Sequence, residues 1–312
     1  TSGDGSIRGH LSSHWGENTQ YINFGSGRTV IDFDVGYRGG CAILDNQSLA
    51  CWGRNDNGAG GHGTNQDRGD SAAEIGDNFP ITDLGSVSYP TQVSRGIYNT
   101  CARFANGGVK CWGHGAYGQN GIGNTAQKGD GGGEMGDSLP FVNLGTGVSA
   151  KQVCTGEYYA CALTNSDQVK CWGRGNYGIN GNGNNGNIGD SSSEMGDNLS
   201  ALDFGTGRTV SKLSCGRYHA CVILDNNQLK CWGRNDRGQL GIGSTAAQGD
   251  HSNEMGDNLD AVNLGTDLYA LEVYLGSLHT CAVLNDNSIK CWGENFDAQL
   301  GAGHRTDVGT LN

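Results

Sequence analysis

Twelve cysteines are the residues of this sequence whose spacing points most directly to a chemistry, the formation of disulfides. Ten of them form five pairs whose members lie ten positions apart, and each second cysteine is followed by Trp-Gly. The pairs recur every 60 residues: Cys41 and Cys51, Cys101 and Cys111, Cys161 and Cys171, Cys221 and Cys231, Cys281 and Cys291. The chain is therefore one unit repeated five times.

The stretch CVILDNNQLKC, residues 221–231, shows how such a pair can close. If its two cysteines face each other across antiparallel strands, a three-residue loop remains, and the last loop residue must tolerate a left-handed backbone. That position holds Gln47, Gly107, Asp167, Asn227 and Asn287, of which only Gln47 departs from the preferred types. Opposed residues of antiparallel strands lie about 4.5 to 5.5 Å apart, close enough for a disulfide. We predict five hairpin disulfides.

The two remaining cysteines, Cys154 and Cys215, lie on the strand before the hairpin in consecutive repeats, in columns displaced by one residue. Neighbouring columns of a strand point to opposite faces, so a disulfide between stacked repeats requires this displacement. We predict a Cys154–Cys215 bridge. Reduced, buried thiols and a zinc site are the alternatives, disfavoured by the register of the pairs and the absence of C-x2-C spacing. Six disulfides indicate an oxidising, extracellular location, either secreted or at the cell surface.

Short strands must position these cysteines, because 56 glycines and only three prolines suit strands joined by tight turns. Each unit reads as a strand near PFVNL (140–144), an alternating strand such as SKLSCG (211–216), and the two hairpin strands. The alternating strand carries an apolar column, Phe33, Val93, Val153, Leu213 and Val273. Four short strands per unit predict an all-β fold, a β-propeller of about five blades in a single domain spanning 1–312. The hairpin units lie near 41–53, 101–113, 161–173, 221–233 and 281–293. The tryptophans are expected to fill the space between blades.

A known family resembles this repeat. The stretches at 161–178, 221–243 and 281–303, for example CVILDNNQLKCWGRNDRGQLGIG, are similar to the regulator of chromosome condensation repeat with its Trp-Gly-x-Asn-x-x-Gly-Gln-Leu-Gly signature. The resemblance covers essentially the whole chain and is nearest to the extracellular, cysteine-paired branch. It implies a propeller, usually of seven blades with shorter units, whereas this sequence holds five longer units.

The two ends of the chain suggest how the propeller closes. Residues 14–27, HWGENTQYINFGSG, align with residues 254–267, EMGDNLDAVNLGTD. We expect the N-terminal segment 14–38 to complete the last blade. Within one chain this closes a ring, and in a neighbouring chain the same contact builds a polymer.

Carboxylates recur in the long polar loops after the first four Trp-Gly pairs, in the pattern Asp-x3-Glu-x2-Asp. Oxygen-rich loops suit Ca²⁺, so these residues are candidate ligands, with hydrogen bonding to backbone N–H groups as the favoured alternative. They are Asp70, Glu74, Asp77, Asp130, Glu134, Asp137, Asp190, Glu194, Asp197, Asp250, Glu254 and Asp257. No other cofactor is expected.

Asn46 and Asn198 begin Asn-x-Ser sequences and are candidate glycosylation sites in a secreted protein. No catalytic pattern stands out: the histidines are scattered, no G-x-S-x-G occurs, and the glycine runs lack the Lys-Ser/Thr of a phosphate loop. We predict a protein that is not an enzyme. A net charge of −12 without a basic cluster argues against nucleic acid as a partner, and no apolar stretch is long enough to span a membrane.

These observations favour a secreted or surface-displayed binding scaffold that holds a protein or glycan partner in its loops. The alternative is a structural subunit of an extracellular filament or coat, whose partners are copies of itself joined end to end. Nucleotide exchange on a small GTPase, as in the nuclear founder of the family, fits poorly because paired cysteines belong outside the cytosol.

Overall fold

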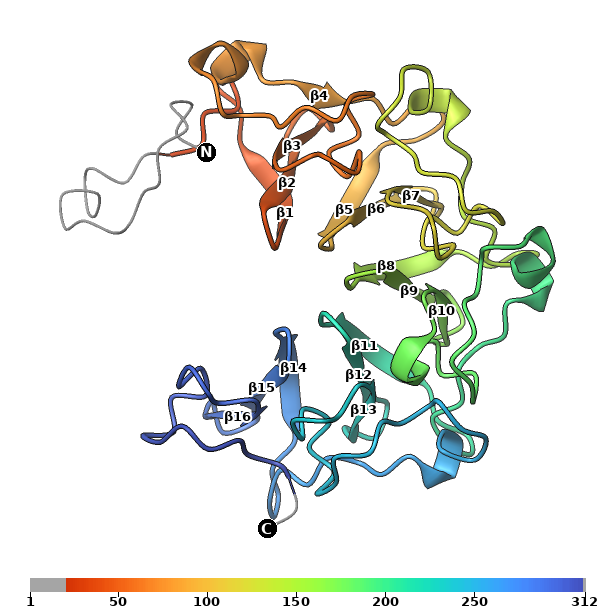
Figure 1. Ribbon diagram of the computed structural model, residues 1–312, viewed down its shortest axis with the longest axis vertical. Helices are drawn as coiled ribbons and strands as arrows, with labels where there is room; N and C mark the ends of the chain where they lie inside the picture. Colours follow the sequence, from red (N-terminus) through yellow and green to blue (C-terminus); the bar gives the residue numbers. More distant parts are fainter. Residues whose placement is uncertain (1–20, 311–312) are drawn as a thin grey trace.

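Five antiparallel sheets follow one another along the chain and lie around a common centre as the blades of a β-propeller (Figure 1). The structure, a computed structural model, describes residues 21–310. Blade 1 holds β1 (Val30–Gly36), β2 (Gly39–Leu44), β3 (Leu49–Gly53) and β4 (Ile81–Thr82); blade 2 holds β5 (Pro90–Arg95), β6 (Asn99–Phe104) and β7 (Val109–Gly113). Blade 3 holds β8 (Ala150–Thr155), β9 (Tyr159–Thr164) and β10 (Val169–Gly173); blade 4 holds β11 (Val210–Cys215), β12 (His219–Leu224) and β13 (Leu229–Gly233). Blade 5 holds β14 (Ala270–Leu275), β15 (His279–Leu284) and β16 (Ile289–Gly293). The predicted all-β propeller is confirmed.

The hairpins have the predicted register. In blade 4, Cys221 lies opposite Cys231 and Ile223 opposite Leu229, with Asn227 at the end of the loop. The residue at the loop end has a positive φ in all five hairpins, including Gln47 at 69°. The hydrogen bonds that close the loop therefore outweigh the moderate cost of a left-handed backbone at a residue other than glycine.

All six predicted disulfides are present. Each hairpin pair is bridged with Cα atoms 4.1 Å apart. Cys154 of β8 is bonded to Cys215 of β11, with Cα atoms 5.6 Å apart, and joins blades 3 and 4. The described part of the chain contains no free cysteine.

The fourth strand differs from the prediction in two ways. The segment near PFVNL completes the preceding blade, since β4 pairs with β3, and only blade 1 has it as a strand. In blades 2 and 3 the equivalent segment makes one backbone bond to the third strand, for example from Val142 N to Val109 O at 2.7 Å, and in blade 4 it forms an isolated bridge between Lys230 and Ala261. In blade 1 as in blade 2, a turn of 3-10 helix precedes the segment, η4 (Gly76–Asn78) or η5 (Gly136–Ser138), and a backbone N–H bonded to an Asp or Asn side chain follows it, which limits the length of the segment in both blades.

Apolar side chains fill the spaces between blades. Val93, Val153, Leu213 and Val273 of the predicted column are buried against the hairpin of the preceding blade. Trp112, Trp172, Trp232 and Trp292 are buried too, and each indole Nε1 donates to a carbonyl in the loop of the preceding blade, as from Trp232 to Ile179 O at 2.8 Å. The expected structural role of the tryptophans is thus seen.

The turns at the inner end of adjacent blades meet closely at the repeated glycine that follows the first strand. A Cβ on Gly96 would lie 2.2 Å from Gly156 O, and a Cβ on Gly36 would lie 2.3 Å from Gly96 O. At Gly36, Gly96 and Gly216 an added side chain would collide with a carbonyl oxygen of the next blade, whereas at Gly156 and Gly276 it would collide with the ring of Tyr159 or His279 in the same blade. Either collision explains why the sequence keeps glycine in this column.

The blades form an open arc, in which blade 1 and blade 5 are not packed against each other (Figure 1). Phe33 on β1 and Tyr274 on β14 are each 63% exposed. The expectation that segment 14–38 completes the last blade is wrong for the residues that the structure describes. Residues 30–36 are β1 of blade 1, and Phe24 packs there against Trp52 and Phe79, because the apolar contacts of this segment lie in its own repeat. Residues 14–20 lie outside the described range.

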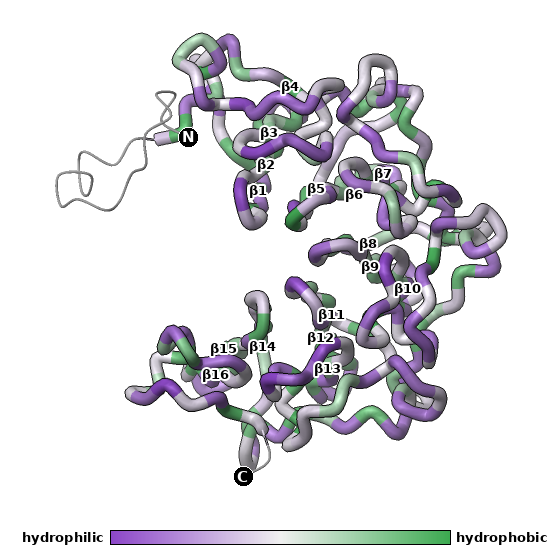
Figure 2. The backbone as a smooth tube through the Cα atoms, in the orientation of Figure 1, coloured by the Kyte–Doolittle hydropathy of each residue, from purple (hydrophilic) through white to green (hydrophobic). Residues whose placement is uncertain are grey.

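Polar and apolar residues alternate over short distances along the described residues, as Figure 2 shows. This pattern suits strands with two different faces. In the described range, 21–310, no helix is long and apolar enough to cross a membrane.

Candidate functional site

The loops at one end of the blades carry a concentration of tyrosine and arginine. These residues come from two places in each repeat, the turn between the first and second strands and the segment that follows the third strand. The two places adjoin because the second and third strands are antiparallel, so that Asn99 at the start of β6 lies opposite Gly113 at the end of β7. We call this surface the Tyr/Arg face. It comprises Tyr37, Arg38, Arg54, Tyr98, Tyr117, Tyr158, Arg174, Tyr177, Arg217, Tyr218 and Arg234.

Blades 2 and 3 share one aromatic group. The rings of Tyr98 and Tyr158 stack at 4.9 Å with an interplanar angle of 16°. Tyr117 meets Tyr158 edge-on at 5.1 Å, and the guanidinium of Arg174 lies 5.0 Å from the Tyr117 ring and 5.6 Å from the Tyr158 ring. His114 flanks the group, 5.4 Å from Tyr158. Stacked rings and cation–π contacts hold these side chains in fixed orientations, so they present a preformed surface.

A second group continues the surface into blade 4. The Arg234 guanidinium lies 5.1 Å from the rings of both Tyr177 and Tyr218, and Arg217 lies 4.7 Å from the Tyr218 ring. Tyr177 and Tyr218 meet edge-on at 6.3 Å. Alternating tyrosines and arginines thus run from blade 2 to blade 4.

A buried carboxylate fixes part of this surface from below. Glu157 is buried and accepts a hydrogen bond from Arg217 at 2.8 Å. Burial opposes the charge of Arg217, but the hydrogen bond and the negative charge of Glu157 outweigh it and raise the pKa of Arg217. Burial, together with the contact to Glu157, raises the pKa of Tyr218 to about 12, and burial raises that of Tyr158. Tyr158 and Tyr218 therefore stay neutral, and Arg217 stays charged, at neutral pH.

The Tyr/Arg face carries positive charge on an acidic protein. Its five arginines adjoin three carboxylates: Asp56 pairs with Arg54, Asp236 with Arg234, and Glu157 with Arg217. Five positive charges against three negative ones leave +2, whereas the whole chain carries −12. The face also holds six of the chain's 11 tyrosines. Tyrosine and arginine are the residue types, with tryptophan, that carry most of the energy of protein interfaces.

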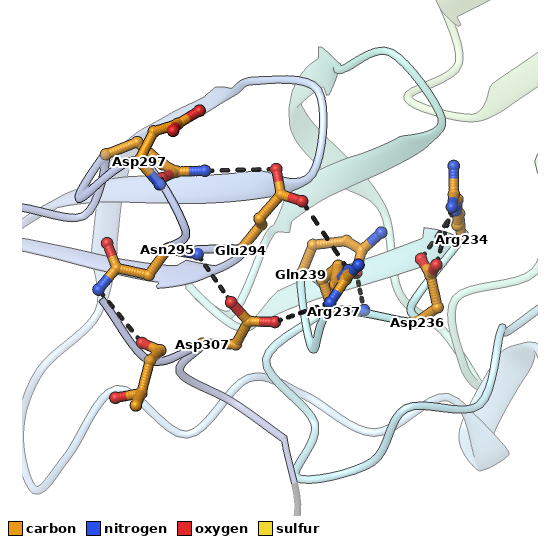
Figure 3. A network of polar contacts seen from close by, with 10 residues as sticks. Arg234, Asp236, Arg237, Gln239, Glu294, Asn295, Asp297 and Asp307 are labelled. Atoms are coloured by element: carbon orange, nitrogen blue, oxygen red, sulfur yellow. Dashed lines mark hydrogen bonds and ion pairs between the residues drawn. The ribbon is translucent and has the colours of Figure 1, made fainter. Parts of the chain in front are cut away.

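Blade 5 limits the face on one side. Arg237, next along the same loop, reaches Glu294 at 3.8 Å and Asp307 at 3.5 Å, which come from the loop after β16 (Figure 3). Asp307 also accepts the backbone N–H of Asn295 at 2.9 Å. Arg237 is therefore used to bind blade 5 to blade 4, and we leave it out of the Tyr/Arg face.

A recess lies at the edge of this face, between blades 1, 2 and 4. Its volume is about 220 Å³. Its lining residues are Tyr37, Arg38, Arg54, Asp56, Asn57, Ala59, Arg95, Ile97, Tyr98 and Arg217. Four arginines and a single aspartate thus line one small space.

The space at the centre of the propeller is larger, about 580 Å³, but several of its polar side chains bind the backbone of the neighbouring blade. Asp32 accepts Val93 N at 2.8 Å, and Asp34 accepts Arg95 N at 2.8 Å; burial raises the pKa of both carboxyls. Gln152 forms the same kind of contact with the backbone of Leu213. These side chains join neighbouring blades and do not converge on a ligand.

The predicted acidic residues of the long loops bind the chain itself. Glu134 accepts Gly129 N at 3.0 Å and Gly131 N at 2.8 Å, and Glu74, Glu194 and Glu254 make equivalent bonds. Asp77, Asp137, Asp197 and Asp257 each accept the N–H and hydroxyl of a serine or threonine 51 residues earlier, which lowers their pKa. Asp130 and Asp190 accept hydrogen bonds from the side-chain amides of Gln127 and Asn187, whereas Asp70 is exposed. Most of these carboxylates therefore accept hydrogen bonds from the chain itself, which was the favoured alternative to calcium ligation. Calcium binding stays a prediction.

A lysine ammonium lies where these loops bring carbonyl oxygens together. Lys230 Nζ donates to Phe204 O and Gly256 O, both at 2.9 Å, and Lys110, Lys170 and Lys290 lie in the same column. In blade 1 the column holds Ala50, and Phe79 fills the space where the other repeats have leucine. The protein thus supplies its own cation at this point in four of the five repeats.

One loop brings three groups together that could hold a metal. Asp250, His251 and Glu254 offer ligand atoms within 4.8 Å of one another, the one such set in the described range. One oxygen of Glu254 already accepts three backbone N–H groups. Two of these residues are among the predicted calcium ligands, but His251 was not predicted.

The remaining sequence candidates lie apart. Asn46, at a hairpin tip, and Asn198, in η8 (Gly196–Asn198), are both exposed, and their glycosylation stays a prediction. His219 and His62 are held in structural contacts, with Nε2 2.8 Å from Thr280 Oγ1 and 3.0 Å from Cys51 O respectively.

The Tyr/Arg face was not predicted from the sequence, although the signal is present there. Tyr98, Tyr158 and Tyr218 occupy one column of the repeat, and Arg54, Arg174 and Arg234 occupy another. An aromatic residue or a cation that recurs beside a turn has no role in the hairpin core, and this could have identified the surface.

Comparisons with known proteins agree with the repeat architecture. Residues 150–179, 210–239 and 272–299 match the family model described as regulator of chromosome condensation (RCC1) repeat. These stretches fall on blades 3, 4 and 5. The chain is 28% identical over 220 residues to the ultraviolet-B receptor UVR8 of Arabidopsis thaliana, covering 69% of this chain and 44% of the receptor. It is 26% identical over 272 residues to the human E3 ubiquitin-protein ligase HERC2, covering 83% of this chain and 5% of the ligase.

Solved structures show the same fold. Human WBSCR16 superimposes with a TM-score of 0.69 at 19% identity, covering 91% of this chain and 66% of that one. Yeast RCC1 (Prp20), in its complex with Kap60, gives a TM-score of 0.65 at 17% identity, covering 92% of this chain and 61% of that one. This chain spans less than half of the curated relatives it matches.

Proposed function

This chain carries regulator of chromosome condensation repeats, and from that premise we propose that it is a non-catalytic β-propeller scaffold that binds a protein or glycan partner through the Tyr/Arg face. The observation that carries the proposal is the gathering of six tyrosines and five arginines at one end of the blades, on an otherwise acidic chain. Function in propellers resides in loops held by a rigid frame. Here ring stacking and the buried Glu157 preorganise those loops, which reduces the entropy lost on binding.

We further propose that the scaffold is secreted or displayed at a cell surface. Its six disulfides support this, because such bonds persist in oxidising compartments. Expression with and without a secretion signal is the test. We expect the six bridges, counted by mass after alkylation, only in secreted material, and folded, fully reduced protein from the cytosol would overturn the proposal.

The binding function is tested by selection from a displayed library of random twelve-residue peptides and by a glycan array, both on the purified, oxidised chain. The test variant is Tyr117→Ala with Arg174→Ala. The control is Tyr89→Ala with Arg208→Ala, which removes the same residue types near the hairpin tips, where Tyr89 O accepts Ala105 N and Arg208 pairs with Asp225. We expect ligands that bind the wild type and the control but not the test variant. If no ligand depends on the face, the proposal fails.

The end-to-end assembly remains a second proposal. The observation that favours it is the exposure of apolar side chains on the two outermost blades, Phe33 on β1 and Tyr274 on β14, in the columns that internal blades use for contact with their neighbours. Light scattering of the purified chain decides between the outcomes. Growth into fibres supports assembly, and a particle of 32.6 kDa at every concentration overturns it.

A further inference from the structure

We propose that the partner of the Tyr/Arg face is an acidic polypeptide segment, and that the recess between blades 1, 2 and 4 holds one of its carboxylates. The inference rests on the proposed binding function and names the chemistry of the ligand. It depends on the contents of the recess, on the state of each arginine there, and on the surface that leads away from it.

The recess has the size and the charge for one anionic group. Its volume of about 220 Å³ exceeds several times the roughly 30 Å³ that a water molecule occupies in the liquid. Arg38, Arg54, Arg95 and Arg217 line it, against Asp56 alone. Asp34 near Arg95, Glu157 beside Arg217 and Asp67 near Arg54 offset part of this charge, but none of the three lines the recess. The side chains that line the recess therefore carry an excess of positive charge, on a chain whose net charge is −12.

The four arginines are not equally available. Arg95 is buried, and its two terminal nitrogens donate to Ala59 O and Arg54 O, so it contributes charge from beneath the recess. Arg54 is exposed and pairs with Asp56, and Arg38 lies over Tyr37, 5.3 Å from the ring centre. No carboxylate within the described residues lies in ion-pair contact with Arg38. Arg38 and Arg54 can thus turn toward a ligand, and a guanidinium binds a carboxylate through two parallel hydrogen bonds.

Arg217 adds an unused donor. One of its terminal nitrogens binds Glu157, while its Nε is buried with no hydrogen-bond partner. A buried donor without a partner costs free energy, and a bound acceptor would recover it only if the Arg217 side chain turned its Nε toward the recess. This side chain belongs both to the recess and to the second tyrosine group, so it connects the two.

The surface beyond the recess favours a polypeptide over a single small anion. Tyr98 lines the recess and stacks on Tyr158, and Arg174 lies over Tyr158 on the far side of that pair. Arg234 follows beside Tyr218. An extended chain advances about 3.3 Å per residue, so one segment can place successive acidic side chains at the recess, at Arg174 and at Arg234 while its backbone and apolar side chains lie on the tyrosines.

The peptide selection described above supplies the first readout, the proportion of Asp and Glu among peptides that bind through the face. The best peptide is then synthesised in two forms, with its acidic residues intact and with each changed to Asn or Gln. Fluorescence polarisation measures both against wild type, Arg38→Ala/Arg54→Ala and the control Arg28→Ala/Arg208→Ala, whose arginines pair with Asp45 and Asp225 away from the recess.

We expect acidic peptides to be enriched, and the amide form to bind roughly tenfold more weakly, as loss of one charge-assisted contact would give. Arg38→Ala/Arg54→Ala should lose at least as much, the control should stay within about twofold, and added salt should weaken binding of the acidic form alone.

Each other result overturns the inference in a recognisable way. Equal binding of the acidic and amide forms through the face means that the scaffold function stands while the acidic partner does not. Binding of sulfated oligosaccharides on the array, with no peptide selected, assigns the positive charge to a glycan. If neither peptides nor glycans depend on the face, the proposed function fails together with the inference.

Discussion

Cys154 on β8 and Cys215 on β11 are joined across two blades at a sequence separation of 61 residues. The same separation relates other inner-strand contacts. Asp34 accepts Arg95 N at 2.8 Å, and Ser94 Oγ lies 3.0 Å from Thr155 Oγ1. The disulfide is therefore one of a series of contacts between neighbouring inner strands, with a covalent bond in place of a hydrogen bond. The disulfide forms because the position on β8 that faces the following blade and the position on β11 that faces the preceding blade both hold cysteine.

The disulfide between blades is expected to stabilise the fold more than any hairpin disulfide. In the chain-entropy view a bridge stabilises according to the length of loop that it closes, about 4 kcal/mol for a loop of this size and about 3 kcal/mol for a hairpin. We predict that Cys154→Ala/Cys215→Ala lowers the melting temperature more than Cys161→Ala/Cys171→Ala. Calorimetry of both variants is the measurement, and a larger loss from the hairpin pair would contradict the prediction.

The lysine that binds loop carbonyls should be replaceable by a different packing. Lys230→Ala leaves Phe204 O and Gly256 O without their donor, and we expect a loss of about 2 to 4 kcal/mol. Blade 1 has alanine with phenylalanine in these columns, Ala50 and Phe79. Adding Leu259→Phe to Lys230→Ala should therefore recover part of the loss in urea denaturation. Lys151→Ala, at an exposed pair with Asp167, serves as the control and should change stability by less than about 0.5 kcal/mol.

Calcium should have little effect on stability. The glutamates of the long loops already accept backbone N–H groups, and a lysine ammonium occupies the carbonyl cluster in four repeats. A site occupied at 100 times its dissociation constant would add about 2.7 kcal/mol, which shifts the melting temperature by several degrees. We expect a shift below about 1 °C between excess chelator and millimolar calcium. A saturable increase of several degrees would establish the calcium site that the loop sequences suggested.

The sequence specified what repeats and left open what differs between repeats. Symmetric cysteine spacing was sufficient for the hairpin register, because Cys221 and Cys231 can oppose each other only if Ile223 opposes Leu229. It did not show that the segment near PFVNL completes the preceding blade, since pairing across repeats depends on the path of a 20-residue polar loop that has no regular periodicity. The Tyr/Arg face was not predicted from the sequence for a related reason. Tyrosine recurs at Tyr98, Tyr158 and Tyr218, but the sequence does not show that this column adjoins the arginine column of the segment after the third strand, and only the folded structure shows that the turns of blades 1 to 4 adjoin.

One buried histidine, His219, and one partly buried histidine, His62, should make the protein less stable in acid. Burial lowers the pKa of His62 to about 4 and that of His219 to about 3. Near pH 6.5 the unfolded chain takes up protons that these folded-state imidazoles do not, so the unfolded state binds more protons. The stability that they contribute is fully present above pH 6.5 and is lost as the pH falls toward the folded-state values. Asp32 and Asp34 act in the opposite direction, because their raised pKa relieves a cost near pH 4.

The histidine effect is therefore measured between pH 6.5 and 5, where the carboxyls contribute least. Each histidine that stays neutral only in the folded state gives a slope of up to about 1.4 kcal/mol per pH unit. His219→Asn installs the residue that blade 2 has in this column, Asn99. The variant should reduce the slope of unfolding free energy against pH by the contribution of one proton. His251→Asn, which makes the same substitution at a side chain that is 76% exposed, is the matched control. An unchanged slope in His219→Asn would mean that the imidazole of His219 is protonated in the folded chain, and that the buried contact with Thr280 is made by a charged donor.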